Sequence, residues 1–147
     1  MDDETIYRKN WNDLIRYATV LVGPGDAEDV VSTVVLRILA RGHLADLDGP
    51  RAYLFRSVLN ECKTRLRRRR SHVSIAEAGG VVVDDTQPHI MQAVLDLPPQ
   101  QRAATYLVYW ASLTVTETAD LMGIHPGTVK RYLHLARRTL RGVLDER

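Results

Sequence analysis

The residues with the clearest chemistry lie between 125 and 141, where basic side chains gather on one face of an expected helix. This stretch holds five Lys or Arg and no Asp or Glu. Such a helix can place its first residues at the edges of nucleobases in duplex DNA and its later Lys and Arg side chains at phosphates. It also fits a second interpretation, an amphipathic helix whose basic face is merely solvated. Six positions are predicted to contact DNA: Thr128, Lys130, Arg131, His134, Arg137 and Arg138.

The residues just before this helix favour DNA binding. Thr114 and Glu117 have the spacing of a capping box, in which each side chain meets the other residue's backbone amide. Ala119 and Gly123 follow where a helix-turn-helix needs a small residue at the helix crossing and a positive φ in the turn. The spacing therefore predicts a helix-turn-helix over residues 114–137.

A second group of basic residues lies on an expected helix over residues 50–70, which ends in four consecutive arginines. Its charged face fits nucleic-acid binding and a solvated helix end equally well, because basic side chains at a helix C-terminus also complement the helix dipole. Two aromatic residues near its start, Tyr53 and Phe55, could stack on unpaired bases. Tyr53 is expected to lie in the core instead.

Helical periodicity dominates the rest of the sequence, so helices must position both groups. In the first half, helices are expected over about 6–22 and 26–41, with a loop over 42–49. Gly23-Pro24-Gly25 separates the two helices, and Asp26 is expected to cap the second.

The second half begins with a segment that favours a linker. Residues 71–90 carry Gly79-Gly80, two aspartates and Pro88. Further helices are expected from Pro98-Pro99 to about Ser112, near 114–122 and near 126–144.

The net charge of +2 is unevenly distributed. Residues 1–70 hold 13 Lys or Arg and 10 Asp or Glu, residues 71–96 hold four acids and no base, and residues 97–147 hold seven bases and four acids. Two basic blocks on either side of an acidic bridge favour a polyanion as partner.

Composition and missing motifs exclude several classes of protein. The 147 residues are 45% hydrophobic, and they contain no apolar run near the ~20 residues of a membrane helix, so no membrane insertion is expected. The acidic start and the one cysteine, Cys62, predict a cytoplasmic protein in which this thiol is an inert core residue. Phosphate-loop, zinc-protease and Gly-x-Ser-x-Gly motifs are absent, and the five histidines lack metal-ligand spacing. No catalytic residue, cofactor, metal site or small-molecule substrate is therefore expected.

Four segments, in this order, resemble the extracytoplasmic-function (ECF) sigma factors, the small two-domain class of bacterial transcription initiation factors. They are Asp26-Ala27-Glu28-Asp29-Val30-Val31, then Arg56, Asn60 and Arg65-Leu66-Arg67-Arg68, then Leu97-Pro98-Pro99-Gln100-Gln101-Arg102, and last Gly127-Thr128-Val129-Lys130 with Leu133-His134 and Ala136-Arg137. The resemblance implies an all-α fold of two small helical domains. Sigma region 2 would occupy residues 1–70, a flexible linker 71–91, and the helix-turn-helix of sigma region 4 residues 92–147.

The resemblance also implies a function without catalysis, in which the protein binds core RNA polymerase and directs it to promoters. Region 2 would recognise and melt the −10 element, and region 4 would read the −35 element as duplex. The positions that fall on the polymerase-facing side are Asp29, Ser32, Thr33, Leu36 and Arg37. Those that fall near the −10 strand are Asp48, Arg51, Arg56, Asn60, Lys63 and Arg67. An anti-sigma factor is a further expected partner.

Two alternatives stay open at this point. One is a helix-turn-helix regulator that binds duplex DNA without polymerase. The other is a degenerate sigma-like interaction protein, because Val30-Val31-Ser32-Thr33-Val34-Val35 replaces the family's usual Leu-Val-Gln-Glu-Thr-Phe. His125-Pro126 also stands where the family usually has a capping Ser and a following residue, so a divergent −35 preference is expected.

Overall fold

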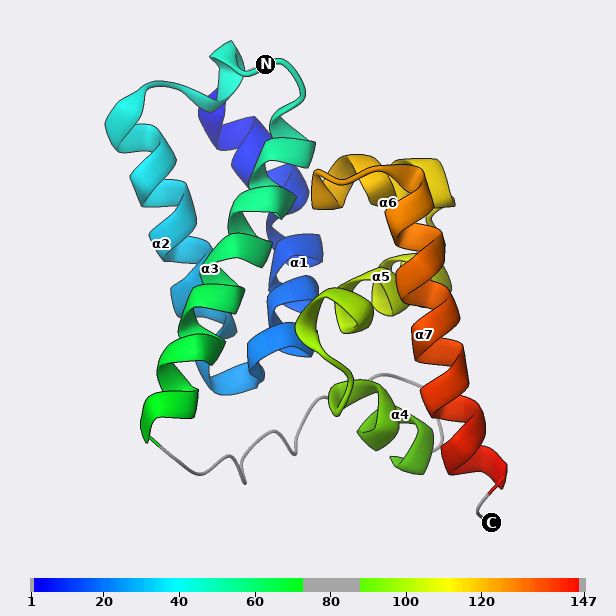
Figure 1. Cartoon of the computed structure of the whole chain (residues 1–147). Coiled ribbons are helices and arrows are strands. Elements are labelled where there is room, and N and C mark those ends of the chain that lie inside the picture. The colour runs from blue at the N-terminus through cyan, green and yellow to red at the C-terminus, as the bar shows by residue number, and fades with distance from the viewer. Residues whose placement is uncertain (1, 73–87, 146–147) are drawn as a thin grey trace. The chain divides into compact units, whose positions relative to one another are not determined.

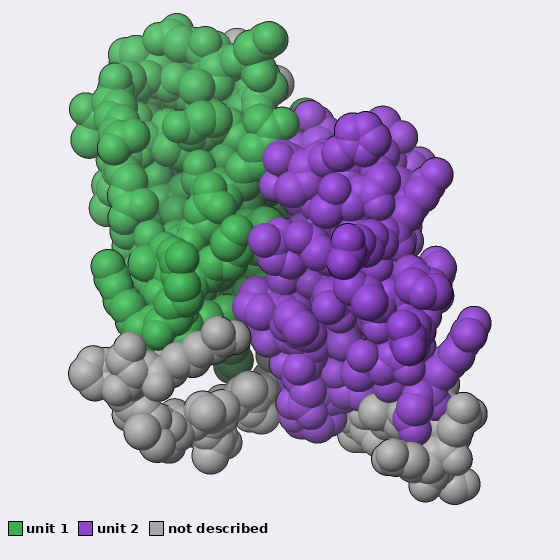
Figure 2. Space-filling model, viewed as in Figure 1, with its two compact units in different colours: residues 1–80 green, residues 81–147 purple. Residues whose placement is uncertain are grey.

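The computed structural model describes residues 2–72 and 88–145 (Figure 1). Within these residues the chain forms helices and connecting loops and no strand, which confirms the all-α prediction. Contacts divide the chain into two compact units, residues 1–80 and 81–147 (Figure 2).

The first unit is built from three long helices and one short turn, namely α1 (Asp3–Val22), α2 (Pro24–Arg41), the 3-10 turn η1 (Leu44–Asp46) and α3 (Pro50–His72). Each long helix packs against the other two (Figure 1). The helices meet through apolar stripes at helical spacing, and burial of these stripes stabilises the unit. Its largest fully buried side chains are Leu14, Tyr17, Leu21, Val30, Val31, Val34, Leu44, Leu54, Phe55 and Val58.

Gly23 joins α1 directly to α2. Its φ of 93° lies in the region that favours glycine, and its N–H closes α1 by donating to the Thr19 carbonyl at 2.9 Å. Pro24 then takes the first position of α2, where a missing N–H costs little. The expectation that Asp26 caps this helix is wrong, because α2 begins two residues earlier with Gly23 as its cap residue and Asp26 lies in its first turn.

The two aromatic residues at the start of α3 are buried the other way round from the prediction. Phe55 is 2% exposed, and its ring centroid lies 5.1 Å from that of Tyr17. Tyr53 is 39% exposed. At 3.6 residues per turn, position 55 aligns with the buried Val58 and Cys62, whereas position 53 aligns with the polar side of the helix.

The second unit contains α4 (Pro88–Leu95), α5 (Pro99–Tyr109), α6 (Val115–Met122) and α7 (Pro126–Asp145). The last helix, α7, packs against the other three. Its Ala136 meets Val94 and Leu97 in a core that Trp110 and Leu140 partly cover. The first half of α4, residues 88–91, falls in the range expected to be linker, and the buried Val94 in its second half packs against Ala136 of α7.

The helix-turn-helix has the predicted local structure. The Thr114 N–H donates to Glu117 Oε1 at 2.9 Å, and the Glu117 N–H donates to Thr114 Oγ1 at 3.0 Å, so the capping box is confirmed. Gly123 ends α6 in the left-handed conformation with a φ of 69°. Ala119 and Val129 are buried, as a close crossing of α6 and α7 requires.

Helices extend into both ends of the range 71–91 that is predicted to be linker, since α3 continues to His72 and α4 starts at Pro88. The two predicted domain boundaries remain predictions. The helix expected from Pro98-Pro99 to Ser112 ends earlier, at Tyr109.

Candidate nucleic-acid interface

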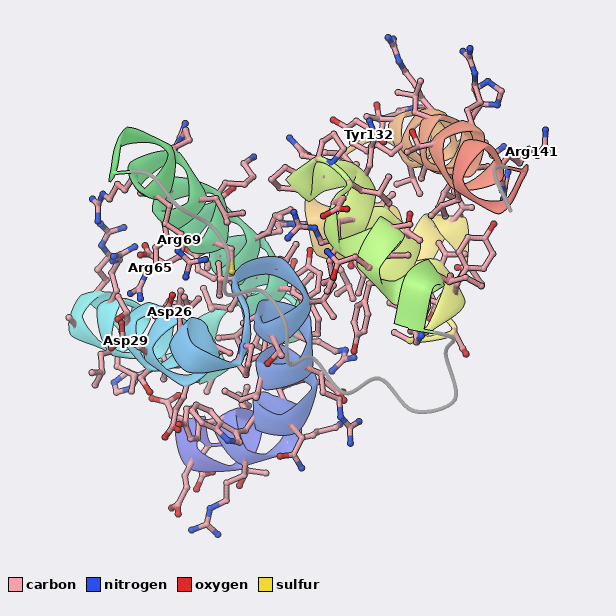
Figure 3. The ribbon with its side chains drawn as sticks, turned by 90° about the horizontal axis from the view of Figure 1, so that it is seen from below. Asp26, Asp29, Arg65, Arg69, Tyr132 and Arg141 are labelled. Carbon is pink, nitrogen blue, oxygen red and sulfur yellow. The ribbon has the colours of Figure 1, made fainter. Side chains whose placement is uncertain are left out.

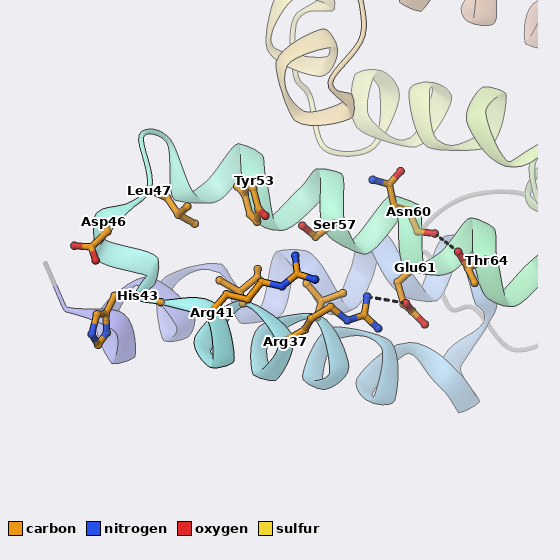
Figure 4. Close-up of a pocket in the computed structure, with 13 residues that line it drawn as sticks. Arg37, Arg41, His43, Asp46, Leu47, Tyr53, Ser57, Asn60, Glu61 and Thr64 are labelled. Atoms are coloured by element: carbon orange, nitrogen blue, oxygen red, sulfur yellow. Dashed lines mark hydrogen bonds and ion pairs between the residues drawn. The ribbon is translucent and has the colours of Figure 1, made fainter.

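A cleft of about 500 Å³ lies between the end of α2, the loop that follows it and one side of α3 (Figure 4). This volume falls in the usual range of small-ligand sites, about 300–1,000 Å³. The residues that line it are Val34, Arg37, Ile38, Arg41, Gly42, His43, Asp46, Leu47, Tyr53, Ser57, Asn60, Glu61 and Thr64.

Five residues of α3 line the cleft, and four of them form a line at helical spacing: Tyr53, Ser57, Asn60 and Thr64. Tyr53 offers an exposed ring, and Asn60 offers an exposed amide with both donors and an acceptor. Aromatic rings stack on the faces of unpaired bases, and amides pair with base edges. The cleft therefore has the chemistry to hold a nucleotide base that has left a duplex.

Glu61 is the buried charge at the far end of the cleft, 7% exposed on the face of α3 that meets α2. Its Oε2 accepts from Arg65 Nε at 2.9 Å, and its Oε1 accepts from Arg37 Nη1 at 3.2 Å (Figure 4). Burial by itself would raise the pKa of the Glu61 carboxyl, but the hydrogen bonds from Arg65 and Arg37 outweigh it and hold the pKa below its ordinary value. The carboxylate is therefore ionised and fixed in place.

Arg65 extends this network to α2. It donates from Nη1 to Asp29 Oδ2 at 2.5 Å and from Nη2 to Thr33 Oγ1 at 3.3 Å. One turn further along α3, Arg69 pairs with Asp26, and Figure 3 shows both arginines facing the two aspartates. The hydrogen bonds that Arg65 donates to Glu61 and Asp29 raise the pKa of Arg65 further, so the cation persists at any physiological pH.

The polar face of α7 forms a second surface. Lys130, Arg131, His134, Arg137 and Arg138 are exposed, whereas Thr128 is half-buried. The opposite side of the helix is fixed to the core by Val129 and Leu133, 0% and 3% exposed. Five of the six residues predicted to contact DNA thus lie on one exposed face of a well-anchored helix, as a recognition helix requires, and Thr128 is the half-buried sixth.

Two contacts hold this surface in shape. The Gly127 N–H donates to His125 Nδ1 at 3.0 Å, so a histidine side chain caps the start of α7 in place of the usual Ser. On α7 itself, Arg137 donates through Nε and Nη2 to the Tyr109 hydroxyl at 2.9 and 2.5 Å, with its guanidinium 5.8 Å from the ring centroid.

Comparison with known proteins agrees with this division into two surfaces. Residues 6–72 match the family Sigma-70 region 2, and residues 89–140 match the family Sigma-70, region 4. The RNA polymerase sigma-E factor of Streptomyces avermitilis is 33% identical over 156 residues, covering 100% of this chain and 87% of that protein. The ECF RNA polymerase sigma factor SigL of Mycobacterium tuberculosis is 33% identical over 148 residues, covering 90% and 83%.

The chain belongs to the ECF sigma factor family. A solved structure of the sigma factor RpoE of Bartonella quintana, in complex with the anti-sigma factor NepR, has the same fold, with a TM-score of 0.72 at 22% identity over 97% of this chain and 96% of that one. The family resemblance and the two-region helical fold predicted from the sequence are confirmed.

The cleft in region 2 of this sigma factor brings together fewer of the predicted −10 residues than expected. Asn60 lines it, whereas Asp48, Arg56, Lys63 and Arg67 lie outside its lining. The sixth, Arg51, is turned toward the helix packing. It donates to Asn10 Oδ1 at 2.8 Å and to Asp13 Oδ2 at 3.1 Å, and it lies 4.8 Å from the centroid of the Phe55 ring.

The predicted polymerase-facing residues share one side of α2. Leu36 is 67% exposed and gives this side of α2 an apolar surface position. Asp29, Thr33 and Arg37 lie beside it and are tied to α3 through Arg65 and Glu61. Ser32 is half-buried.

Sequence reasoning missed Ser57 and Thr64 as cleft residues and Glu61 as a buried charge, and it considered Tyr53 for base stacking but placed it in the core. The signal for Ser57 and Thr64 was present, since they lie on one line with Tyr53 and Asn60 at helical spacing. Glu61 gave no such signal, because its burial depends on two arginines that lie on different helices.

Within the described residues there is no cluster of side chains suited to a metal ion and no helix that could span a membrane.

Proposed function

We infer that this sigma factor binds core RNA polymerase and directs it to promoters, with no catalytic step of its own. The observation that carries this is the presence of both sigma regions in order, each with its own surface suited to nucleic acid. The work would take place in the cytoplasm, where polymerase and chromosome are found.

Region 4 would read the −35 element as duplex. Thr128, Lys130 and Arg131 stand at the start of α7, the part of a recognition helix that reaches base edges in the major groove. His134, Arg137 and Arg138 lie further along the same face, where phosphates are within reach. Phosphate contacts supply affinity that falls with salt, and base contacts supply the choice of sequence.

Region 2 would capture the −10 strand once it is unpaired. The cleft offers a ring for stacking in Tyr53 and an amide for base edges in Asn60. Arg56, Lys63 and Arg67 would guide the phosphates of the same strand, with Asp48 in the loop beside it. Arg51 is the weakest member of this set because its guanidinium already holds α1 and α3 together.

The outer side of α2 would bind polymerase. Leu36 supplies the apolar centre of the patch, with Asp29, Ser32, Thr33 and Arg37 around it. Regulation would come from an anti-sigma factor, a partner that the structurally similar RpoE has in its solved complex.

The decisive experiment reconstitutes the full chain with core RNA polymerase and offers the holoenzyme a library of genomic fragments. The expected result is run-off transcripts from a subset of fragments that core polymerase alone does not transcribe. Failure to obtain any promoter-dependent transcript would contradict the proposal. Tight duplex binding by the free chain, unchanged by polymerase, would instead identify a regulator that acts alone.

A further inference from the structure

The loop that closes one end of the cleft is tied to the first turn of α1 by a single carboxylate. Asp3 Oδ1 accepts from the Ala45 backbone N–H at 3.0 Å, and Asp3 Oδ2 lies 2.9 Å from His43 Nδ1. These contacts join residues 40 and 42 positions apart in the sequence. Among the described residues, these two contacts are the hydrogen bonds seen between α1 and this loop.

The same loop supplies several of the cleft's residues. Gly42, His43, Asp46 and Leu47 all line it, and Figure 4 shows His43 and Asp46 at the end of the cleft away from Glu61. Local bonds shape the turn itself, since the Asp46 N–H donates to the His43 carbonyl at 3.2 Å and the Leu47 N–H donates to the Leu44 carbonyl at 3.1 Å. They do not fix how the turn is oriented against the helices.

Two anchors supply that orientation. One is Leu44, which is 0% exposed and packs the turn η1 against α1. Apolar packing is non-directional, so this contact alone does not fix how the turn is tilted. The second anchor is the Asp3 carboxylate, which contacts both sequence neighbours of Leu44, the backbone N–H of Ala45 and the ring of His43.

We propose that Asp3 is a positioning residue for reading the −10 element: it fixes the orientation of the 43–47 loop and thereby the shape of the cleft. The proposal rests on the proposed function, because it assigns the loop a part in holding the −10 strand. Asp3 itself touches no DNA in this arrangement. It acts through His43, Asp46 and Leu47.

The charge state of the pair supports this geometry. The hydrogen bond and the charge of Asp3 raise the pKa of the His43 imidazole, with a smaller contribution from the Asp46 carboxylate. The hydrogen bonds from His43 and from the Ala45 amide lower the pKa of Asp3. Each group therefore favours the charged form of the other, and the contact is an ion pair when His43 is protonated.

The neighbouring residue provides a matched control. Asp2 accepts from the Thr5 N–H at 2.8 Å and caps α1, without a described contact to the loop. Asp2→Ala should loosen the first turn of α1 as a cap loss does, whereas Asp3→Ala should release the loop. Asp3→Asn keeps an acceptor oxygen for the Ala45 amide and removes the charge that His43 meets, so it should fall between wild type and Asp3→Ala.

The first measurement needs no DNA. Amide exchange at Ala45 should be on the order of tenfold faster in Asp3→Ala than in wild type or Asp2→Ala, as loss of a hydrogen bond to a charged group implies. NMR titration should show the pKa of His43 raised in wild type and Asp2→Ala and returned toward its ordinary value in Asp3→Asn. If Ala45 exchanges equally fast in all variants, Asp3 does not anchor the loop and the proposal is overturned.

The second measurement tests the role in reading. Holoenzyme made from each full-length variant is offered duplexes with randomised −35 bases and an unpaired, randomised −10 strand. Asp3→Ala should lower the enrichment of preferred −10 bases by on the order of tenfold while −35 preferences and holoenzyme assembly stay as in wild type. A merely structural role would weaken assembly or both preferences together.

The outcomes separate the two levels of inference. If wild type selects −10 bases and Asp3→Ala selects the same bases equally well, the positioning role is overturned and the proposed function stands. If wild type holoenzyme selects no bases at all, the proposed function fails and the positioning role fails with it, whatever Ala45 exchange shows.

Discussion

A network of charged side chains links α2 to α3 beside the cleft. Arg65 contacts Glu61, Asp29 and Thr33, and Glu61 in turn contacts Arg37. A buried ion pair adds little to stability as a whole, but removal of one partner leaves the other buried and uncompensated. The cost of mutation is therefore expected to be large at Glu61 and small at exposed pairs such as Arg8 with Glu4.

Glu61→Gln should lower the free energy of unfolding of the first unit by about 2 kcal/mol at neutral pH, as loss of hydrogen bonds to a charged group implies. Because the folded pKa of Glu61 is depressed, its stabilising contribution exists above the unfolded pKa and is lost as pH falls through the folded pKa. The difference between wild type and variant should therefore shrink below about pH 4.3, the ordinary carboxyl pKa. Urea unfolding over a pH series measures it, with the exposed Glu28→Gln as control, and an equal loss in both variants would contradict the prediction.

Removal of the Thr118 hydroxyl should stabilise the second unit. The residue is 0% exposed, and its Oγ1 has no hydrogen-bond partner among the described atoms. Thr118→Val keeps the shape and removes the buried polar atom, so it should raise the free energy of unfolding of the second unit by about 1 kcal/mol. Thr105 is equally buried, but its hydroxyl donates to the Gln101 carbonyl at 2.8 Å, so Thr105→Val should give no gain. A loss of stability in Thr118→Val would show that the hydroxyl has a partner.

At the scale of elements, the end of α5 and the middle of α7 support each other. Tyr109 is 51% exposed, yet its hydroxyl receives two hydrogen bonds from Arg137. The contact restricts a long, flexible side chain on the proposed DNA face, and a guanidinium held in place loses less entropy when it meets phosphate.

Tyr109→Phe should therefore weaken −35 duplex binding by the holoenzyme about threefold while leaving its salt dependence unchanged, because the phosphate contact itself remains. Arg137→Ala should weaken binding more and lower the slope of log affinity against log salt by about one. Fluorescence titrations at several salt concentrations measure both. Tyr7→Phe in the first unit is the control, and an unchanged affinity in Tyr109→Phe would show that Arg137 needs no such support.

The elements also show what sequence alone can and cannot determine. The capping box at Thr114 and the turn at Gly123 follow from short-range rules and are present as predicted. The burial of Phe55 instead of Tyr53 depends on the ring of Tyr17, which a helix other than α3 supplies. The helix α4 becomes recognisable when its apolar side meets Ala136 on α7. Tertiary partners, which a local pattern does not contain, contributed to both of these cases, whereas Ser57 and Thr64 were missed although their helical spacing is visible in the sequence.

For the whole molecule, the two units are expected to contribute to different steps of initiation. Lys130→Ala with Arg131→Ala should weaken duplex binding at least about tenfold, since each base contact is worth about 1–3 kcal/mol. Tyr53→Ala with Asn60→Ala should leave duplex binding near wild type and reduce promoter opening by about tenfold, because stacking on an unpaired base is worth about 1–3 kcal/mol.

Filter binding to closed promoter duplex measures duplex binding, and permanganate reactivity of the −10 strand measures promoter opening. Arg8→Ala is the control, because it removes one exposed positive charge outside both proposed surfaces. The opposite pattern, in which the α7 variant binds duplex normally but fails to open it, would contradict the assignment of steps to units.

The direct joint at Gly23 has a consequence for how the length of this region can change. Because one glycine both ends α1 and begins α2, no loop exists there to absorb an added or lost residue. One residue inserted between Gly23 and Leu36 would turn the following part of α2 by about 100°. Leu36 would then take the place of Arg37 beside Glu61, and the buried Val35 would take the exposed place of Leu36. Related chains should therefore vary in the side chains of this stretch while keeping its residue count constant.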